Sequence, residues 1–275
     1  MSILVTGVAG FVGVNLTAVL LERGEHVIGF DNLCRGKREH LAAFEGDSRF
    51  RFEIVDLADL DEYRRAFAAA HATEPVTEVW HMAANSDIPA GIEDPAIDHR
   101  DTFLTTFNTL ILMREFGVGA IAFASSSAVY GDLGDQRLRE DIGPLFPISN
   151  YGAMKLASEA AISAALESYL ERAWIFRFPN VIGVPATHGI ILDLVRKLAV
   201  SPAVLDVLGN GTQQKSYLHV EELVDAMLYI REHSSQAMNC FNIGPSDDGV
   251  TVRFIAETVR DHVSPEAVLR FGEGD

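Results

Sequence analysis

The sequence has 275 residues, of which 48% are hydrophobic, and this indicates one large α/β domain or a domain with a small additional lobe. The 22 Lys and Arg residues against 39 Asp and Glu residues give a formal net charge of −17, which argues against nucleic acid as a partner. Two cysteines, no signal-peptide pattern and no apolar run of membrane-spanning length predict a soluble cytoplasmic protein, with no metal site indicated.

The N-terminal part of the chain alternates short apolar segments with helix-like sequence. Residues 3–5 predict a buried strand, 10–23 the following helix and 27–30 the next strand. The alternation continues with predicted strands at 50–55, 78–81, 121–124 and 174–178. Repeated strand and helix segments of this kind predict an α/β fold with a Rossmann-like, doubly wound parallel sheet.

A glycine-rich turn, TGVAGFVG, joins the first predicted strand to the first helix. Gly7 and Gly10 would allow a tight turn and let a pyrophosphate approach the backbone, and Gly13 would let the helix lie close to the sheet. The N-terminus of that helix would then face the anion. Turn chemistry alone could also explain three glycines, but their place at the first strand-to-helix junction favours dinucleotide binding.

The acidic residue that this motif requires follows at the end of the second strand. Asp31 and Asn32 lie where a carboxylate accepts hydrogen bonds from the adenosine ribose, which favours NAD. The basic group Arg35, Lys37 and Arg38 leaves NADP as a minor alternative, because it could hold a 2′-phosphate. Asp56, with Leu57, could lie near the adenine ring or could equally cap a helix.

Two polar clusters come later in the chain. Ser125, Ser126 and Ser127 follow the strand at 121–124, at the end of the sheet where doubly wound folds bind ligands. Tyr151 and Lys155 are four residues apart in a predicted helix over 151–170, so they share one face. The helix-like stretches 95–116 and 151–170 are rich in Ala, Leu and Phe, which suits either a dimer interface or a core.

The pattern changes after Asn180, where Pro and Gly residues break the chain into short pieces. We expect a dinucleotide-binding domain over 1–180, rejoined by part of 213–243. A smaller substrate lobe is expected over 181–275, apparently truncated at its C-terminus.

These motifs together resemble the extended short-chain dehydrogenase/reductase family, and within it the nucleotide-sugar epimerases and dehydratases. The resemblance rests on TGVAGFVG, DN at 31 and 32, HMAAN from His81, SSSAVYG, Tyr151 with Lys155, RFPNVIG from Arg177 and GNGTQQKSYLHV from Gly209. It implies that Tyr151 takes the proton from the sugar 4-hydroxyl while hydride passes to NAD, that Ser126 binds the 4-oxygen and that Lys155 holds the nicotinamide ribose.

The resemblance also implies two sets of binding residues, which include the three catalytic ones. For the cofactor they are Gly7, Gly10, Phe11, Val12, Gly13, Asp31, Asn32, Asp56, Leu57, Met82, Ala83, Ala84, Ser125, Tyr151, Lys155, Phe178, Asn180 and Val181. For the nucleotide sugar they are Asn85, Ser126, Ser127, Asn180, His188, Gly189, Ile190 and Lys215. His81 and His219 are given no proton-transfer role.

The residues after Ser126 distinguish members of the family. Sugar dehydratases carry Asp and Glu where this chain has Ser127 and Ala128, so dehydration lacks its general acid. Epimerisation needs no extra residue, and we expect a homodimeric UDP-glucose 4-epimerase acting on UDP-galactose and UDP-glucose. A UDP-glucuronate decarboxylase or another 4-keto-forming enzyme is the alternative.

Some positions depart from the family pattern. Thr102 stands where an Asn is usual, and Lys215 stands where Arg is common, which keeps the charge but loses bidentate phosphate recognition. These departures and the expected truncation leave a non-catalytic NAD-binding protein as an alternative of another class. A net dehydrogenase, which would accumulate NADH, is a third.

Overall fold

The structure is a computed structural model that describes residues 1–134, 136–187 and 189–273. The chain divides into two compact units, and each is formed by two separate segments. The first unit contains Met1–Phe178 and Glu221–Ile243, and the second contains Pro179–Val220 and Gly244–Asp275. The chain therefore leaves the first unit after β6, returns for one helix and one strand, and leaves again.

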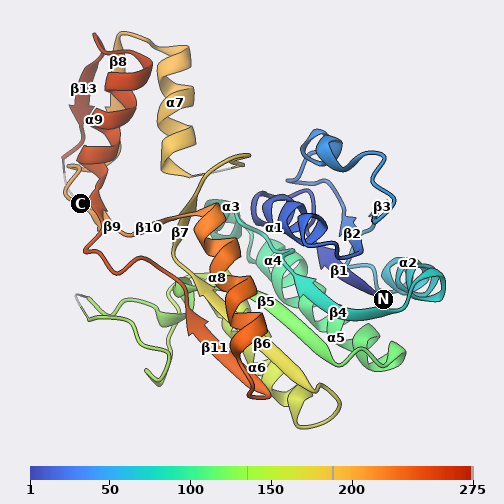
Figure 1. The fold of residues 1–275 in the computed structure, drawn as a ribbon. Helices are drawn as coiled ribbons and strands as arrows, with labels where there is room; N and C mark the ends of the chain where they lie inside the picture. Colours follow the sequence, from blue (N-terminus) through green and yellow to red (C-terminus); the bar gives the residue numbers. More distant parts are fainter. Residues whose placement is uncertain (135, 188, 274–275) are drawn as a thin grey trace. The chain divides into compact units, whose positions relative to one another are not determined.

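The first unit is built on a parallel sheet with the strand order β11-β6-β5-β4-β1-β2-β3 (Figure 1). Its described strands are β1 (Ser2–Thr6), β2 (Val27–Asp31), β3 (Phe50–Ile54), β4 (Val76–His81), β5 (Ala120–Ser126), β6 (Arg172–Phe178) and β11 (Met238–Asn242). The predicted doubly wound parallel sheet is confirmed. Strand order reverses between β1 and β4, so the carboxyl ends of these two strands border the crevice where such sheets bind ligands.

Helices cover both faces of this sheet. They are α1 (Phe11–Glu22), α2 (Leu60–Thr73), α3 (Ile88–Glu93), α4 (Pro95–Asp98), α5 (Thr105–Phe116), α6 (Asn150–Leu166) and α8 (Val220–His233), with short 3-10 segments η1 (Arg38–Phe44) and η3 (Ser127–Tyr130) and a π-helical segment η2 (His99–Leu104).

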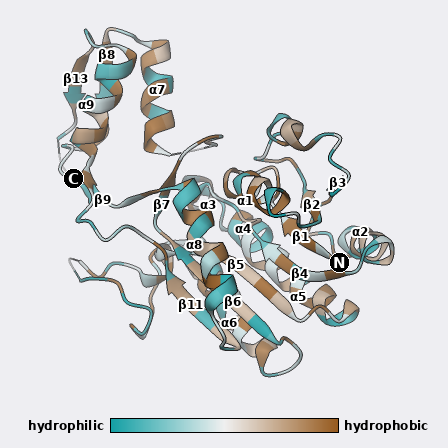
Figure 2. Ribbon diagram, viewed as in Figure 1, coloured by the Kyte–Doolittle hydropathy of each residue, from teal (hydrophilic) through white to brown (hydrophobic). Residues whose placement is uncertain are grey.

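Successive residues of β4 point to opposite faces of the sheet and contact different helices. Val79 packs with Phe67 of α2, Leu112 of α5 and Ile162 of α6 in one buried cluster. Glu78 points to the opposite face, where Arg231 of α8 donates to it at 2.9 Å. The central strands carry mainly hydrophobic residues (Figure 2), as expected for a sheet that is buried on both sides.

The helix predicted over 95–116 is interrupted. Residues 99–104 form the π-helical segment η2 between α4 and α5. The hydroxyl groups of Thr105 and Thr106 both donate to the carbonyl oxygen of Thr102, at 3.1 and 2.9 Å. Wider helical turns of this kind are frequent at functional sites, and this one turns Asp98 and Thr102 inward, where both are buried.

The second unit has small paired strands and two helices. Its elements are β7 (Asn180–Ile182), α7 (Ile190–Val200), β8 (Val204–Val207), β9 (Gln214–Lys215), β10 (Tyr217–His219), β12 (Val250–Thr251), α9 (Val252–Val263) and β13 (Val268–Phe271). Strand β7 pairs with β10 and β8 with β13 in parallel, while β9 and β12 are antiparallel. Leu194 of α7, Leu205 of β8 and Ile255 of α9 belong to one apolar cluster. No helix in the described ranges is long and apolar enough to cross a membrane.

Candidate active site

The glycine turn after β1 closely abuts the backbone that follows β4. Gly7 has a φ of +68°, and a Cβ there would lie 2.7 Å from the amide nitrogen of Ala83. A Cβ at Gly13 would overlap the carbonyl oxygen of Gly7, so α1 lies close against the turn only because this residue has no side chain. Gly10 caps α1 without a side-chain hydrogen bond, which leaves first-turn N–H groups for an anion.

Asp31 lies at the end of β2 beside this turn. Its Oδ2 accepts from the N–H of Ala9 at 3.0 Å and its Oδ1 from the N–H of Leu33 at 2.8 Å. Burial raises the pKa of Asp31, while these two backbone hydrogen bonds lower it. A carboxylate oxygen has two lone pairs, so each oxygen can still accept a ribose hydroxyl.

The residues that follow Asp31 include one of the basic side chains that a 2′-phosphate would need. Asn32 Oδ1 accepts from the N–H of Cys34 at 3.1 Å and so fixes the turn that follows β2. Arg35 donates to Asp87 Oδ2 at 2.8 Å. Of the three basic residues with which NADP binding was argued, Arg35 therefore has a carboxylate partner in this structure.

Asp56 and Leu57 follow β3. Asp56 Oδ1 accepts from the N–H of Ala58 at 3.0 Å, and Arg100 pairs with Oδ2. The alternative that Asp56 caps a helix is wrong, because the N-cap of α2 is Asp59. Leu57 is buried, and its carbonyl oxygen accepts from Asn108.

The loop after β4 contains the next group of predicted residues, Met82, Ala83, Ala84 and Asn85. The N–H of Met82 donates to the carbonyl oxygen of Thr6 at 3.1 Å, which holds this loop beside the glycine turn. Asn85 is buried, and its Nδ2 donates to the carbonyl oxygen of Asp87 at 3.0 Å and to Asp98 Oδ1 at 2.8 Å. Both amide hydrogens of Asn85 thus serve the protein itself, and its Oδ1 already accepts from the N–H of Asp87 at 3.0 Å, so one lone pair of Oδ1 is left for a sugar.

Ser126, Tyr151 and Lys155 lie together at the carboxyl end of β5. Ser126 is the last residue of β5, and its hydroxyl group accepts from the N–H of Ala128 at 3.2 Å. Tyr151 lies in the first turn of α6, which Ser149 caps by accepting from the N–H of Gly152 at 3.0 Å. The Ser126 hydroxyl group is close enough to the phenol of Tyr151 to lower its pKa.

Lys155 lies one turn further along α6 and is 1% exposed. Its Nζ donates to the carbonyl oxygen of Ala124 and lies 5.7 Å from the centre of the Tyr151 ring. The Nζ also lies 4.8 Å from the centre of the Phe123 ring. The ammonium group is therefore held between a strand carbonyl and two aromatic rings, beside the phenol of Tyr151.

Burial dominates the electrostatics of these side chains. It raises the pKa of Tyr151 to about 12, while the Ser126 hydroxyl group lowers that pKa and the carboxyl group of Asp98 raises it. Burial lowers the pKa of Lys155 to about 7, opposed by the negative charge of Glu159. His81 is fully buried, and burial lowers its pKa to about 3, so its ring is neutral and bonds Thr6 at 2.8 Å.

A buried ion pair beside this site is absent from the sequence predictions. Arg177 of β6 donates from Nε and Nη2 to the two carboxylate oxygens of Glu159, at 3.0 and 2.7 Å. Ser125, which was predicted to contact the cofactor, donates its hydroxyl group to the same carboxylate. Glu159 follows Tyr151 and Lys155 at the same four-residue spacing, and that periodicity is the sequence signal that could have found it.

Predicted residues after Phe178, the last residue of β6, belong to the second unit. Asn180 begins β7 and donates to the carbonyl oxygen of Ser216 at 3.2 Å, and Val181 pairs with Leu218 of β10. Gly189, at a φ of +110°, caps α7, which begins at Ile190. Lys215 is exposed in β9, and His188 lies outside the described residues.

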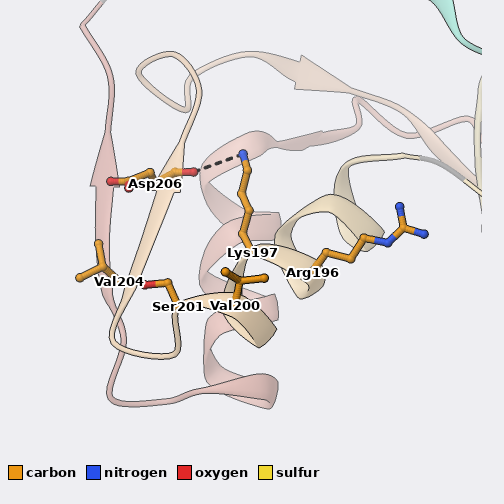
Figure 3. A pocket seen from close by; sticks show the side chains of 6 residues that line it. All are labelled: Arg196, Lys197, Val200, Ser201, Val204 and Asp206. Carbon is orange, nitrogen blue, oxygen red and sulfur yellow. Dashed lines mark hydrogen bonds between the residues drawn. The ribbon is translucent and has the colours of Figure 1, made fainter.

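A separate hollow lies in this second unit, between α7 and β8. It has a volume of about 390 Å³ and is lined by Arg196, Lys197, Val200, Ser201, Val204 and Asp206 (Figure 3). Lys197 points toward β8 and donates to the carbonyl oxygen of Asp206 at 3.4 Å. None of the predicted site residues lines it, and we assign it no part in the chemistry.

Comparison with known proteins is consistent with this geometry. The model of the NAD-dependent epimerase/dehydratase family matches residues 3–244. A UDP-glucose 4-epimerase of Corynebacterium glutamicum is 30% identical over all of this chain and 85% of its own length, and a UDP-glucuronate 4-epimerase of Thermodesulfobacterium geofontis is 25% identical over 99% and 84%. A Thermus thermophilus UDP-glucose 4-epimerase, solved in complex with NAD, has a TM-score of 0.85 and 28% identity and covers all of this chain and 87% of its own.

Proposed function

Because the chain belongs to the NAD-dependent epimerase/dehydratase family, we propose that it epimerises C4 of a nucleotide sugar, UDP-galactose or UDP-glucose, through a transient 4-keto sugar. The observation that carries this proposal is the assembly of Ser126, Tyr151 and Lys155 at the carboxyl end of β5. The enzyme is an NAD-dependent isomerase. The sugar and the roles of individual residues are what we propose.

The glycine turn, Asp31 and the loop after β4 fit NAD. Gly7 and Gly13 leave the space that a pyrophosphate and the α1 N-terminus require, and Asp31 offers acceptors for the adenosine ribose. When bound, NAD would supply the hydride acceptor for oxidation at C4 of the sugar and the hydride donor for its reduction from the other face. Asp56 and Met82 would lie along the same cofactor path.

Tyr151 is the proposed base. Its phenolate oxygen would take the proton of the sugar 4-hydroxyl, and Ser126 would hydrogen-bond the 4-oxygen and hold it at the phenol. After rotation of the 4-keto sugar within the site, the Tyr151 hydroxyl would return its proton to the 4-oxygen. The proton and the hydride are thus both restored, and no net oxidation occurs.

Lys155 would supply part of the free energy that ionisation of Tyr151 requires. The phenol, with a pKa of about 12 in this structure, must lose roughly 5 units to work near pH 7, which corresponds to about 7 kcal/mol. A full positive charge at 5.7 Å with an effective dielectric constant of about 20 supplies roughly 3 kcal/mol. A ribose hydroxyl that accepts from Nζ would favour the charged form of Lys155, so we expect the base to become competent only when NAD is bound.

The turn after Ser126 favours epimerisation over dehydration. Its residues 127–130 are Ser, Ala, Val and Tyr, and the N–H of Ala128 already donates to Ser126. This turn therefore offers no carboxylic acid to protonate a departing sugar hydroxyl. Decarboxylation of a UDP-uronic acid needs only the 4-keto sugar and is the second candidate reaction.

We also propose that the protein is a cytoplasmic homodimer joined through the region of α4, η2, α5 and α6. Phe107 of α5 is 45% exposed, as an interface residue on this segment would be. The two cysteines are free, which suits a reducing compartment. Light scattering after gel filtration of the protein and of Phe107→Glu tests the dimer, and a monomeric unaltered protein would refute it.

Parallel incubations, one with UDP-galactose and one with UDP-glucuronate, test the proposed reaction. Each contains the protein and NAD, NADH is followed by its absorbance, and the product is identified by chromatography. UDP-glucose formed without net NADH supports epimerisation. Stoichiometric NADH would indicate a dehydrogenase. Carbon dioxide from UDP-glucuronate would indicate a decarboxylase, and NAD binding without conversion of any of these sugars would indicate a non-catalytic protein.

A further inference from the structure

Asp98, the last residue of α4, is a buried carboxyl group that the proposed mechanism does not use. Its side chain is 1% exposed. Oδ1 accepts from Asn85 Nδ2 at 2.8 Å, whereas Oδ2 has no hydrogen-bond partner among the described residues. Buried carboxylate oxygens normally have partners, because a buried charge without compensation is costly. This residue therefore calls for an explanation other than packing.

The backbone holds Asp98 next to the start of the catalytic helix. A Cβ at Gly91 would overlap Asp98 Oδ2, so the carboxyl group lies directly against the Gly91 backbone. The carbonyl oxygen of Gly91 accepts from Asn150 Nδ2 at 2.9 Å, and Asn150 precedes Tyr151. Glycine at 91 and the turn at the start of η2 thus bring a carboxyl group to the side of α6 where Tyr151 begins.

The charges around Asp98 do not neutralise it. Asp87 and Asp101 are the negative groups that act on it, and together with burial they raise the pKa of Asp98. Arg35 is paired with Asp87, and Arg100 with Asp101, while no described cation pairs with Asp98 itself.

Two groups of opposite charge act on Tyr151. Lys155, with its Nζ at the Ala124 carbonyl, is the cation near the ring, and Asp98 is the anion that acts on the phenol. Ser126 contributes a neutral hydroxyl group. An ionised Asp98 makes loss of the Tyr151 proton less favourable, which opposes the effect of Lys155.

Resting on the proposed role of Tyr151 as the base, we propose that Asp98 is a positioning residue whose buried carboxyl group sets the pH range in which Tyr151 accepts the sugar proton. The carboxyl group acts through its charge and does not touch the substrate. Ionised Asp98 keeps Tyr151 protonated to a higher pH and restricts turnover there. Removing only the charge should therefore extend activity to lower pH.

The test compares kcat against pH, with saturating NAD and UDP-galactose, for the unaltered protein, Asp98→Asn and Asp101→Asn. Asparagine keeps the oxygen that accepts from Asn85 while it removes the charge. We expect the acid limb of the Asp98→Asn profile to move by about one unit to lower pH, an increase of about tenfold at a pH on that limb. Above the limb the two rates should agree.

Asp101→Asn is the matched control, because it makes the same change of charge three residues away and should leave the limb in place. A profile of Asp98→Asn that superimposes on that of the unaltered protein overturns the inference. An equal shift in Asp101→Asn also overturns it, since the effect would then be one of overall charge.

A titration separates failure of this inference from failure of the proposed function. Tyrosinate absorbance against pH, measured as the difference between each protein and its Tyr151→Phe version, reports the phenol without turnover. We expect the Tyr151 midpoint to be lower in Asp98→Asn than with Asp98 intact, and equal midpoints overturn the inference. Turnover that survives in Tyr151→Phe instead refutes the proposed base.

If Asp98→Asn does not fold, as judged by its melting curve, the unaltered protein supplies the same information. With carbon-13 at the tyrosine Cζ, the Tyr151 resonance should shift when the carboxyl group of Asp98 titrates. A resonance that does not move through that pH range overturns the inference.

Discussion

Glu159→Gln is expected to destabilise the first unit strongly, although the substitution is nearly isosteric. The carboxylate is 5% exposed and receives two hydrogen bonds from Arg177, itself 7% exposed, and one from Ser125. Glutamine cannot accept all three and leaves the guanidinium without its buried counter-charge. Breaking a buried pair in this way costs about 3–5 kcal/mol, which is a large part of the roughly 5–15 kcal/mol that stabilises a typical protein.

The assay is urea unfolding without NAD, followed by circular dichroism. The matched control is Asp141→Asn, which breaks the exposed pair of Asp141 with Arg139 and should leave the urea midpoint where it was. The double variant Glu159→Gln with Arg177→Met should recover part of the loss, because the unpaired cation is gone. A loss of less than about 1 kcal/mol in Glu159→Gln would refute the reasoning.

Three further predictions concern the cofactor and the catalytic side chains. Tyr151→Phe should abolish epimerisation and leave NAD affinity within about twofold, measured by calorimetry, and normal turnover would exclude the assigned role. Gly7→Ala should weaken NAD binding at least tenfold, because the methyl group meets the Ala83 backbone at a φ of +68°, whereas Gly143→Ala, with open space around it, should bind normally. Lys155→Met should stabilise the NAD-free protein near pH 7. The pKa of Lys155 falls from 10.5 to about 7 on folding. Burial of this lysine therefore lowers the free energy of unfolding by an amount that grows as pH falls from 10.5 to about 7, and it has no such effect above pH 10.5. An equal melting temperature for Lys155→Met and the unaltered protein at pH 7 would contradict this.

The sheet could be predicted from the sequence because a parallel strand buried on both faces is a short apolar run, and each such run ends at a recognisable turn. The break in the helix over 95–116 could not be, because nothing in this helix-like segment marks residues 99–104 as a wider turn. The sharing of the Thr102 carbonyl oxygen by the Thr105 and Thr106 hydroxyl groups is likewise seen only in the structure.

The same division applies to the site. The helical spacing places Tyr151 and Lys155 on one face, and the family resemblance adds Ser126, at the end of a strand, to the same site. The pairing of Glu159 with Arg177 joins side chains 18 residues apart, and no local pattern records it beyond the helical spacing of Glu159. The role proposed for Asp98 could not be predicted either. It depends on a buried carboxylate oxygen that has no hydrogen-bond partner among the described residues, and hydrogen-bond partners cannot be read from a sequence.

The order of the strands has a consequence for synthesis on the ribosome. Strand β11 covers the edge of β6, where Ala173, Trp174 and Ile175 are buried, yet it is made only after the whole segment Pro179–Val220 of the second unit. While that segment is being translated, the nascent sheet ends in an apolar strand with unpaired N–H and C=O groups, which is the kind of edge that invites aggregation. The nascent chain is therefore prone to aggregate through this edge until Met238–Asn242 leaves the exit tunnel and pairs with β6.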